Sequence, residues 1–430
     1  MKPKKFKETE IGMIPEDWEF IEFFKLLSEK TRNGIYKQKG FHGSGVKVIN
    51  MKELFAYSKI GNQEMKRVRL NDSEMSRFLV QEGDLIFARR SLVAEGSGKC
   101  SLIVKHSEPI TFESSIILAR PNKNEVDSEF LYYFFSSPKG HYVMGTILRQ
   151  VAVSGITGTD LMKLKVIKPS LPEQRSIAKI LSDLDSKIEL NQQMNKTLEA
   201  IGQAIFKRWF VDFEFPNEKD KLYRSSGGEM VESEFGKIPK GWKVGEVIDE
   251  FNLTMGQSPP GNSYNDRGKG VAFFQGRTDF GFRYPTKRIF CTEPARFADA
   301  GDTLVSVRAP VGDINMANEK CCIGRGVAAI HHKTGSRSYT YYSMQNLSGN
   351  FSNFEAEGTV FGSIGKTDFE QIKIIIPPEK LVNLFEKIVC GIDQKIESNS
   401  SIIVILSQTR DSLLPRLMSG KIRVPVEVRA

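Results

Sequence analysis

The stretch SGITGTDLMKLKVIKPSLPE, residues 154–173, returns later in the chain as GSIGKTDFEQIKIIIPPE, residues 362–379. Both copies begin with a loop of small residues and continue with a β-branched run typical of a strand. Both then reach prolines that precede a long pattern of polar and apolar residues. The same loop, strand and helix in the same order predict a fold that is built twice.

Three further pairs of matching blocks support this duplication. IGMIPEDWEF (11–20) matches FGKIPKGWKV (235–244), GDLIFARR (83–90) matches GDTLVSVRAP (301–310), and DSKIELN (185–191) matches DQKIESN (393–399). Because the blocks keep their order in both halves, chance does not explain them. A tandem duplication is the simplest account.

The chain after Pro172, and again after Pro378, has the pattern of a long amphipathic helix. No proline follows through Phe215 in the first copy, whereas Pro415 is expected to break the second near its end. About 40 residues give each helix a length of about 60 Å, and each apolar stripe must be covered. We therefore expect an antiparallel coiled coil, which keeps the globular part before each helix at an opposite end. The expected seam residues are Ile177, Leu181, Leu184, Ile188, Asn191, Leu198, Ile205, Phe385, Val389, Ile392, Ile396, Asn399, Ile403, Leu406 and Leu413.

Two of these seam positions are polar. Asn191 and Asn399 are equivalent in the repeat and lie near the helix midpoints. In an antiparallel pair with a pseudo-two-fold axis they could face each other, and such a buried polar pair fixes register at some cost in stability. The alternative is that both lie on solvated flanks of the seam.

The segment before each helix has short β-branched runs such as VKVIN (46–50), DLIFAR (84–89) and SSIILAR (114–120). FLYYFFSS (130–137) fits either a buried helix or a strand. The expected fold class is α+β, with two tandem-repeated α/β domains separated by two long antiparallel coiled-coil helices. The expected boundaries are 1–172 for the first domain, 173–215 for the first helix, 216–234 for a linker, 235–377 for the second domain, and 378–420 for the second helix and tail.

Composition limits the partners and the compartment. The 430 residues carry a net charge of +9, which suits a polyanionic partner. Five cysteines without a C-x-x-C pair argue against a disulfide framework or a zinc site, and fit a reducing cytoplasm. The charged start MKPKKFKETE has no apolar core, so no signal peptide is expected, and no apolar run is long enough for a bilayer.

No complete catalytic motif is present. Gly365, Lys366 and Thr367 end a P-loop pattern, but Val360 stands where its first glycine is needed, and a strand is expected to follow. The first copy of this loop has no lysine. SPPGNSY (258–264) only partly matches the [DN]-P-P-[YF] methyltransferase motif, and the five histidines lack metal-ligand spacing. We therefore expect neither catalytic nor metal-binding residues in this chain.

Two basic modules on a helical spacer suit DNA, whose grooves recur about every 34 Å. Such modules would read two separated half-sites with unread base pairs between them. Because the two modules differ in sequence, the site should be asymmetric.

The chain resembles the specificity subunits of type I restriction–modification systems over essentially its whole length. The motifs that carry the resemblance are IGMIPEDW, FGKIPKGW, LPEQRSIAKILSDLDSKIE and LLPRLMSGKIRV (413–424). The resemblance implies that the two domains are target recognition domains, that the helices are a spacer, and that this subunit catalyses nothing. It implies two methylation subunits that transfer a methyl group from S-adenosylmethionine to adenine N6, and restriction subunits that use ATP and Mg²⁺.

Candidate DNA contacts lie in exposed loops rich in glycine and polar residues, where Arg and Lys read guanine and Asn and Gln read adenine. In the first module they are Arg32, Asn33, Tyr36, Lys37, Lys47, Arg89 and Arg90, and in the second Gln257, Ser258, Tyr264, Gln275, Arg277 and Arg308. Gln275 and Arg277 are the foremost base readers, and Arg308 is a candidate for a phosphate.

The duplicated loop offers further hydroxyl and N–H donors for a phosphate, from Thr157, Thr159, Lys366 and Thr367. A plain turn before the strand is the favoured alternative for this loop, with Asp160 and Asp368 as turn or cap residues.

Two other functions remain open at this point. The chain could be a coiled-coil adaptor that assembles proteins without reading DNA sequence. A third possibility is an enzyme, either an ATPase or a fused methyltransferase.

Overall fold

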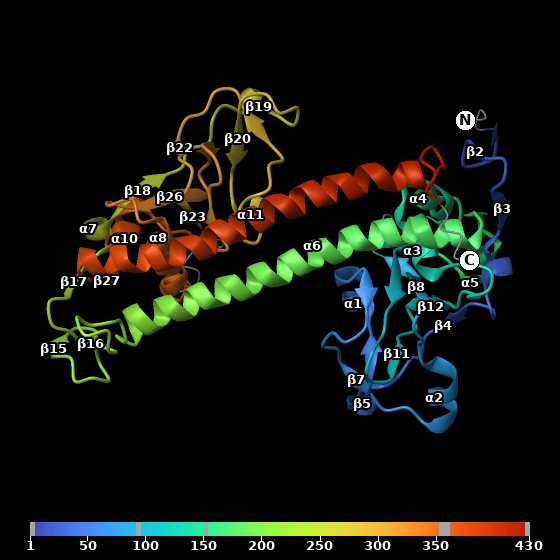
Figure 1. Ribbon diagram of the computed structural model, residues 1–430, viewed down its shortest axis with the longest axis horizontal. Coiled ribbons are helices and arrows are strands. Elements are labelled where there is room, and N and C mark those ends of the chain that lie inside the picture. Colours follow the sequence, from blue (N-terminus) through green and yellow to red (C-terminus); the bar gives the residue numbers. More distant parts are fainter. Residues whose placement is uncertain (1–4, 92–95, 150–153, 352–361, 426–430) are drawn as a thin grey trace. The chain divides into compact units, whose positions relative to one another are not determined.

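The computed structural model describes residues 5–91, 96–149, 154–351 and 362–425 of the chain. It divides into two compact units, which we call unit 1 (Met1–Leu190 with Ile402–Ala430) and unit 2 (Asn191–Ser401). Two long helices, α6 (Leu171–Phe206) and α11 (Glu379–Leu417), each contribute to both units and are drawn in green and red in Figure 1.

Unit 1 is built around a five-stranded sheet of order β4-β12-β8-β10-β6 and a three-stranded sheet of order β11-β5-β7. Its strands are β1 (Phe6–Lys7), β2 (Ile14–Pro15), β3 (Glu19–Glu22), β4 (Arg32–Asn33), β5 (His42–Ile49), β6 (Lys59–Ile60), β7 (Arg67–Val68), β8 (Leu85–Ala88), β9 (Arg90–Ser91), β10 (Cys100–Ile103), β11 (Ile110–Phe112), β12 (Ile116–Ala119), β13 (Ser154–Gly155) and β14 (Lys165–Lys168). Its shorter helices are η1 (Phe23–Leu26), η2 (Lys39–Phe41), α1 (Met51–Ala56), α2 (Asp72–Phe78), α3 (Ser128–Ser136), α4 (Pro138–Gly145) and α5 (Gly158–Lys163).

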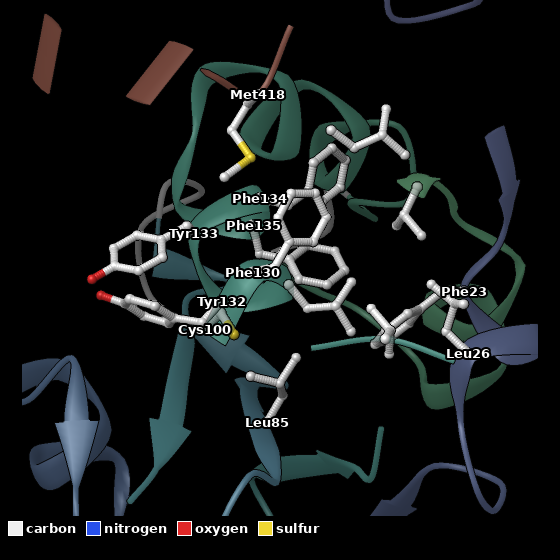
Figure 2. Close-up of a cluster of buried hydrophobic side chains, with 14 of the residues drawn as sticks. Phe23, Leu26, Leu85, Cys100, Phe130, Tyr132, Tyr133, Phe134, Phe135 and Met418 are labelled. Carbon is white, nitrogen blue, oxygen red and sulfur yellow. The ribbon is translucent and has the colours of Figure 1, made fainter. Parts of the chain in front are cut away.

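The segment FLYYFFSS, which the sequence left undecided, forms helix α3. Asp127 caps it by accepting a hydrogen bond from the Phe130 backbone N–H (2.9 Å). Every residue from Phe130 to Phe135 is buried, and such a short, continuous apolar run fits a buried helix or a buried strand. Figure 2 shows these aromatic side chains packed together, with Met418 from the C-terminal end of the chain beside them.

Unit 2 repeats this organisation with sheets of order β18-β26-β23-β24 and β19-β21-β20-β25-β22. Its strands are β15 (Met230–Ser233), β16 (Gly236–Pro239), β17 (Lys243–Glu246), β18 (Phe251–Met255), β19 (Tyr264–Asn265), β20 (Val271–Phe274), β21 (Phe290–Cys291), β22 (Phe297–Ala298), β23 (Thr303–Ser306), β24 (Ile314–Met316), β25 (Cys321–Ile323), β26 (Val327–His332) and β27 (Lys373–Ile376). Its shorter helices are η4 (Lys207–Val211), α7 (Val247–Glu250), η5 (Gly261–Ser263), η6 (Arg277–Asp279), α8 (Arg337–Asn346) and α10 (Lys366–Glu370). In unit 2, α8 and the β18-β26-β23-β24 sheet lie beside the first half of α11 (Figure 1).

The pairing of strands confirms the duplication. In unit 1 the strand after the repeated loop, β14, pairs antiparallel with β3, so that Lys165 lies opposite Glu22. In unit 2, β27 pairs with β17 in the same register, and Lys373 lies opposite Glu246. The repeated tryptophans that precede β3 and β17, Trp18 and Trp242, are both buried.

The helices α6 and α11 run antiparallel in each unit. In unit 1 Asp185 pairs with Arg410 at 2.8 Å, and in unit 2 Asn195 forms a hydrogen bond with Asn399 at 2.9 Å. The residue numbers thus increase along one helix in the direction in which they decrease along the other. The fifteen expected seam residues are all buried or half-buried. No helix in the described segments is both long and apolar enough to cross a membrane.

Two expected helix ends need correction. The first α-helix ends at Phe206 instead of reaching Phe215, and a π turn, η4, follows it. Trp209 and Phe210 are adjacent yet both buried, and the wider turn lets both enter the core. Pro415 does not break the second helix, which continues to Leu417. A proline removes only its own N–H donor, and the turns before it keep their hydrogen bonds.

The expected polar pair at the seam also needs correction. The Asn399 side-chain amide donates to the Asn195 side-chain oxygen, and Asn195 donates to the Ser400 hydroxyl (3.1 Å). Asn191 is buried but is not the residue opposite Asn399 in this hydrogen bond. The reason is register: the antiparallel pairing places Asn195, one helical turn further along, against Asn399.

Candidate nucleic-acid interface

Unit 2 has a pocket of about 180 Å³ at the ends of β20 and β23. Three arginines and one glutamine line it, together with small residues. The lining residues are Gln275, Gly276, Arg277, Thr278, Arg308, Ala309, Arg325 and Gly326. The sequence predicted three of its polar side chains as DNA contacts, Gln275, Arg277 and Arg308, and the structure brings them together.

A tight turn places Arg325 next to Gln275. The Gly326 backbone N–H donates to the Gln275 carbonyl (3.1 Å), and the Val307 N–H donates to the Gly326 carbonyl (3.0 Å). A Cβ at Gly326 would overlap the Gln275 carbonyl, so only glycine allows this approach. Sequence reasoning missed Arg325, although Gly-Arg-Gly directly before a buried strand was a signal for an arginine held at a turn.

Only some of the positively charged side chains that line the pocket have a partner among the described residues of unit 2. Arg277 pairs with Asp313 (2.8 Å), and both side chains are about half-exposed. Arg325 donates to the Ser258 hydroxyl (3.3 Å). The side chains of Arg308 and Gln275 are exposed and form no hydrogen bond or ion pair within the described part of the chain. The pocket can therefore receive an acceptor such as a phosphate or a guanine edge.

The repeated loop lies beside Arg308. Arg308 forms a backbone bridge with Ser363, and the Ile364 N–H donates to the Val307 carbonyl (3.1 Å). Thr367 and Lys366 are exposed nearby in sequence, and Lys366 forms an ion pair with Glu370 (3.5 Å). The fold thus joins two predicted features, the arginine after β23 and the duplicated loop.

Unit 1 has the same arrangement. Arg90 in β9 lies opposite Gly155 in β13, and the Ile156 N–H donates to the Arg89 carbonyl (3.0 Å). Arg90 is exposed, whereas the Arg89 guanidinium is half-buried and reaches the Ser114 carbonyl (3.5 Å). The repeat offsets make Arg90 the counterpart of Arg308 and Gly155 the counterpart of Ser363.

The duplicated loop also serves as a helix cap. The Thr157 hydroxyl accepts from the Asp160 N–H (3.1 Å) and donates to the Asp160 carboxylate (2.7 Å). The Thr157 hydroxyl, with Arg149, holds the pKa of Asp160 below its usual range. Thr159 is exposed. A short helix, α5 or α10, therefore stands between loop and strand in each copy, which corrects the expected direct turn into a strand.

This short helix does not make the second loop a nucleotide site. Helix α10 has five residues, and Gly365 caps it without a side-chain hydrogen bond. Val360, the residue in the place of the first P-loop glycine, lies outside the described residues.

Several first-module candidates are engaged within unit 1. Lys47 is buried and pairs with Glu108 (3.2 Å), because it points inward from β5, and this burial excludes it as an exposed contact. Lys37 pairs with Glu74 (2.7 Å), and Arg32 contacts Glu29 and the Arg77 carbonyl.

Two candidates in the same segment remain available. Tyr36 is 78% exposed, and Asn33 is exposed at the end of β4. Sequence reasoning missed Arg69, whose guanidinium lies 5.8 Å from the centre of the Phe41 ring, a ring that the Lys37 ammonium also approaches, at 4.7 Å. Together these side chains form an aromatic and basic surface on unit 1.

Of the remaining second-module candidates, one is exposed and the other is held by contacts within unit 2. Gln257 is exposed. The Tyr264 hydroxyl donates to the Pro259 carbonyl (2.8 Å), and its ring stacks on Phe273 with 4.8 Å between centres. Tyr264 therefore supports the loop rather than presenting a free hydroxyl.

The fold and this site define a class of protein: a duplicated α+β chain that presents a basic loop cluster at equivalent places in each half. Within the described segments no group of three or more potential metal ligands occurs. A model of the type I restriction modification DNA specificity domain matches residues 15–200 and 239–397, and the chain belongs to that family.

Individual relatives agree with this assignment. The chain is 34% identical over 98% of both lengths to a Methanocaldococcus jannaschii protein assigned as the MjaX type I restriction enzyme specificity subunit. It is 25% identical to the MjaIX specificity subunit of the same organism, over 97% of this chain and 96% of that protein. The crystal structure of a type I restriction–modification S subunit from M. genitalium matches 93% of this chain and 96% of its own, with a TM-score of 0.60 and 15% identity, which supports the fold.

Proposed function

We propose that this chain is the DNA-reading subunit of a type I restriction–modification complex and binds a split, asymmetric site. Family membership supports a role in DNA specificity. The observation that carries the split site is the equivalence of Arg90 beside Gly155 with Arg308 beside Ser363, one basic loop cluster in each half. Because the neighbouring side chains differ, the two half-sites differ.

The second half-site is read from the pocket of unit 2. Gln275 has the amide that pairs with adenine, and Arg277, Arg308 and Arg325 have the guanidinium fork that pairs with guanine or phosphate. Thr159 in unit 1, and Lys366 and Thr367 in unit 2, contribute phosphate contacts that position the duplex without reading it.

The chemistry belongs to partner subunits. Two methylation subunits would transfer a methyl group from S-adenosylmethionine to adenine N6, and restriction subunits would add ATP- and Mg²⁺-dependent cleavage. An adaptor that reads no sequence would leave the two basic clusters without a role, so we prefer the DNA-reading function.

Reconstitution with the methylation subunits tests the proposal. We expect methylated adenines to map to one split asymmetric sequence, with binding that weakens steeply as salt rises. The variant R308A should weaken methylation of that site, whereas K320A, which removes one exposed lysine from the same unit, should not. Equal methylation of random duplexes by the wild-type complex would contradict the proposal.

Exchange of residues 236–376 for those of a relative separates the two half-sites. We expect the half-site read by unit 2 to change and the other to remain. An unchanged recognition sequence after the exchange would favour the adaptor.

A further inference from the structure

The two long helices carry equivalent aspartates with different partners. Asp185 on α6 and Asp393 on α11 differ by the repeat offset of 208. In unit 1 Asp185 accepts a hydrogen bond from the Tyr133 hydroxyl (2.6 Å) and pairs with Arg410 (2.8 Å). In unit 2 Asp393 accepts from the Tyr342 hydroxyl (3.2 Å) and pairs with Arg283 (3.0 Å). Each unit therefore has a tyrosine, an aspartate and an arginine in contact, but the arginines are not equivalent.

The arginines come from different parts of the fold. Arg410 belongs to α11, and its counterpart on α6 is position 202 (410 − 208), which is glycine. A Cβ at Gly202 would overlap the Tyr342 hydroxyl, so a side chain has no room there. In unit 2 the guanidinium that pairs with the aspartate belongs instead to Arg283, which lies in the segment between η6 and β21.

Arg283 contacts both long helices. Its side chain is completely buried, and it bonds to Glu199 on α6 (Nε to Oε2, 3.0 Å) and to Asp393 on α11. Its guanidinium stacks on the Tyr341 ring, 3.8 Å from the ring centre. Gln345 donates to the second oxygen of Glu199 (2.7 Å). A buried charge is tolerated only when it is paired and hydrogen-bonded in this way.

The segment that carries Arg283 also carries the pocket residues. Arg277 lies in the pocket, six positions before Arg283 (283 − 277 = 6). Between them the Asn315 side chain donates to the Gly281 carbonyl (2.9 Å), and the Met316 N–H donates to the Arg283 carbonyl (2.8 Å). One end of this segment thus lines the pocket and the other end is bonded to α6 and α11.

We propose that Arg283 is a positioning residue that fixes the pocket segment, residues 275–283, on the long helices and so sets where unit 2 reads its half-site. This inference rests on the proposed function. Arginine suits the task because its planar fork can bond two carboxylates at once, which lysine does not match. Loss of this bond leaves the pocket side chains present but able to shift along the duplex.

Two variants in the complete methylation complex test the inference. R283K keeps the charge and loses the fork, and the triple variant E199Q/R283M/D393N removes all three charges so that no buried carboxylate is left unpaired. The control is K287M, four positions after Arg283 (287 − 283 = 4) and outside the pocket segment, which breaks the exposed ion pair with Glu319 (2.6 Å). The substrates carry the two half-sites at the native gap, or at gaps one base pair longer or shorter.

We expect R283K and the triple variant to lose roughly tenfold or more of the preference for the native gap, because shifts of about 1 Å at a reading site have effects of that order. K287M should match the wild type. The salt dependence of non-specific binding should not change in any variant, since the phosphate-contacting cations remain. A folded R283K complex with wild-type gap preference would overturn the inference.

A second readout separates this inference from the proposed function. If the wild-type complex prefers no site, the proposed function fails, and amide hydrogen exchange of residues 276–282 in the DNA-free chain still tests the anchoring. Exchange should be faster in R283K and in the triple variant than in the wild type or K287M. Equal exchange in all four proteins would overturn the positioning role.

Discussion

At the scale of single residues, one charged cluster in unit 1 connects residues near the start of the chain with a residue near its end. The Trp18 indole N–H donates to Glu173 (3.1 Å), and Arg423 pairs with both Glu173 (2.6 Å) and Asp17 (2.7 Å). In unit 2 the residue equivalent to Arg423 is Phe215 (423 − 208), which stacks on Trp242 with 5.4 Å between ring centres. A cation in unit 1 and an aromatic ring in unit 2 cover the repeated tryptophan.

Removal of the arginine should therefore destabilise unit 1. In R423M the nearly buried Glu173 loses its ion-pair partner, and we expect a loss of about 2–3 kcal/mol in the free energy of unfolding, less than for a fully buried pair. Chemical denaturation of the whole chain measures it. K165M, which breaks the exposed pair with Glu10, should change stability by less than about 0.5 kcal/mol. Equal effects of the two variants would contradict the importance of Glu173 burial.

Asp17 in the same cluster makes a pH-dependent contribution. The hydrogen bond and charge of Arg423 hold the pKa of Asp17 below its usual range. A lowered folded pKa means that this stabilisation is complete above the unfolded pKa of about 3.9 and is lost as pH falls through the lower folded value. We expect D17N to flatten this part of the acid unfolding profile, and stability near pH 7 to fall only slightly. An unchanged acid limb would contradict the assignment.

At the scale of elements, two glycines in the long helices make a matched pair. Alanine normally stabilises a helix by about 1 kcal/mol relative to glycine. Gly391 on α11 has no neighbouring atom within 4 Å of the place that an added methyl group would take, so G391A should gain that amount. At Gly202 the added methyl group overlaps the Tyr342 hydroxyl, so G202A should lose about 1–3 kcal/mol through overpacking. Urea denaturation of both variants gives the comparison, and the same sign for both would refute this account of Gly202.

The asparagine pair at the seam gives a second element-scale prediction. N399L alone leaves the buried Asn195 without this partner, and we expect a loss of about 1–2 kcal/mol. The double variant N195L/N399L should recover that loss or exceed wild-type stability, because apolar residues pack better in a seam. M194L, at an exposed position of the same helix, should be neutral. A double-mutant cycle on thermal unfolding with no coupling energy would contradict direct pairing.

Sequence reasoning predicted the elements better than their contacts. The seam, the strands near residues 46, 84 and 114, and the duplication follow from periodicity and self-similarity. Helix α3 was undecided because a short, continuous apolar run fits a buried helix as well as a buried strand. The inward direction of Lys47, the pairing of Asn195 and the place of Arg325 depend on register and on distant backbone, which one sequence does not contain.

At the scale of the whole molecule, the chain crosses from one unit to the other at two places, and each of them lies inside a long helix. It leaves unit 1 after Leu190 in α6 and returns after Ser401 in α11. The two units are therefore joined by a helix in both directions along the chain. If the units read two half-sites, the length of these helices should set the number of unread base pairs.

Matched insertions into both helices test that idea. Whole heptads after Leu190 and Ser401 preserve the seam. Three heptads in each helix add about 31 Å at 1.5 Å per residue, which is close to one turn of DNA at about 34 Å. We expect the preferred gap to lengthen by about nine base pairs, with both half-sites unchanged, because nine base pairs bring the second half-site to within about 50° of its original face of the duplex.

One heptad makes the informative comparison. It adds about 10 Å, or about three base pairs, and three base pairs turn the second half-site by about 100° around the duplex axis. Methylation by that complex should fall at every gap, although its helices pair as well as those of the longer variant. Sequencing of methylated adenines in libraries with variable gaps measures both outcomes. Altered half-sites at an unchanged gap would show that the helices do not measure distance along DNA.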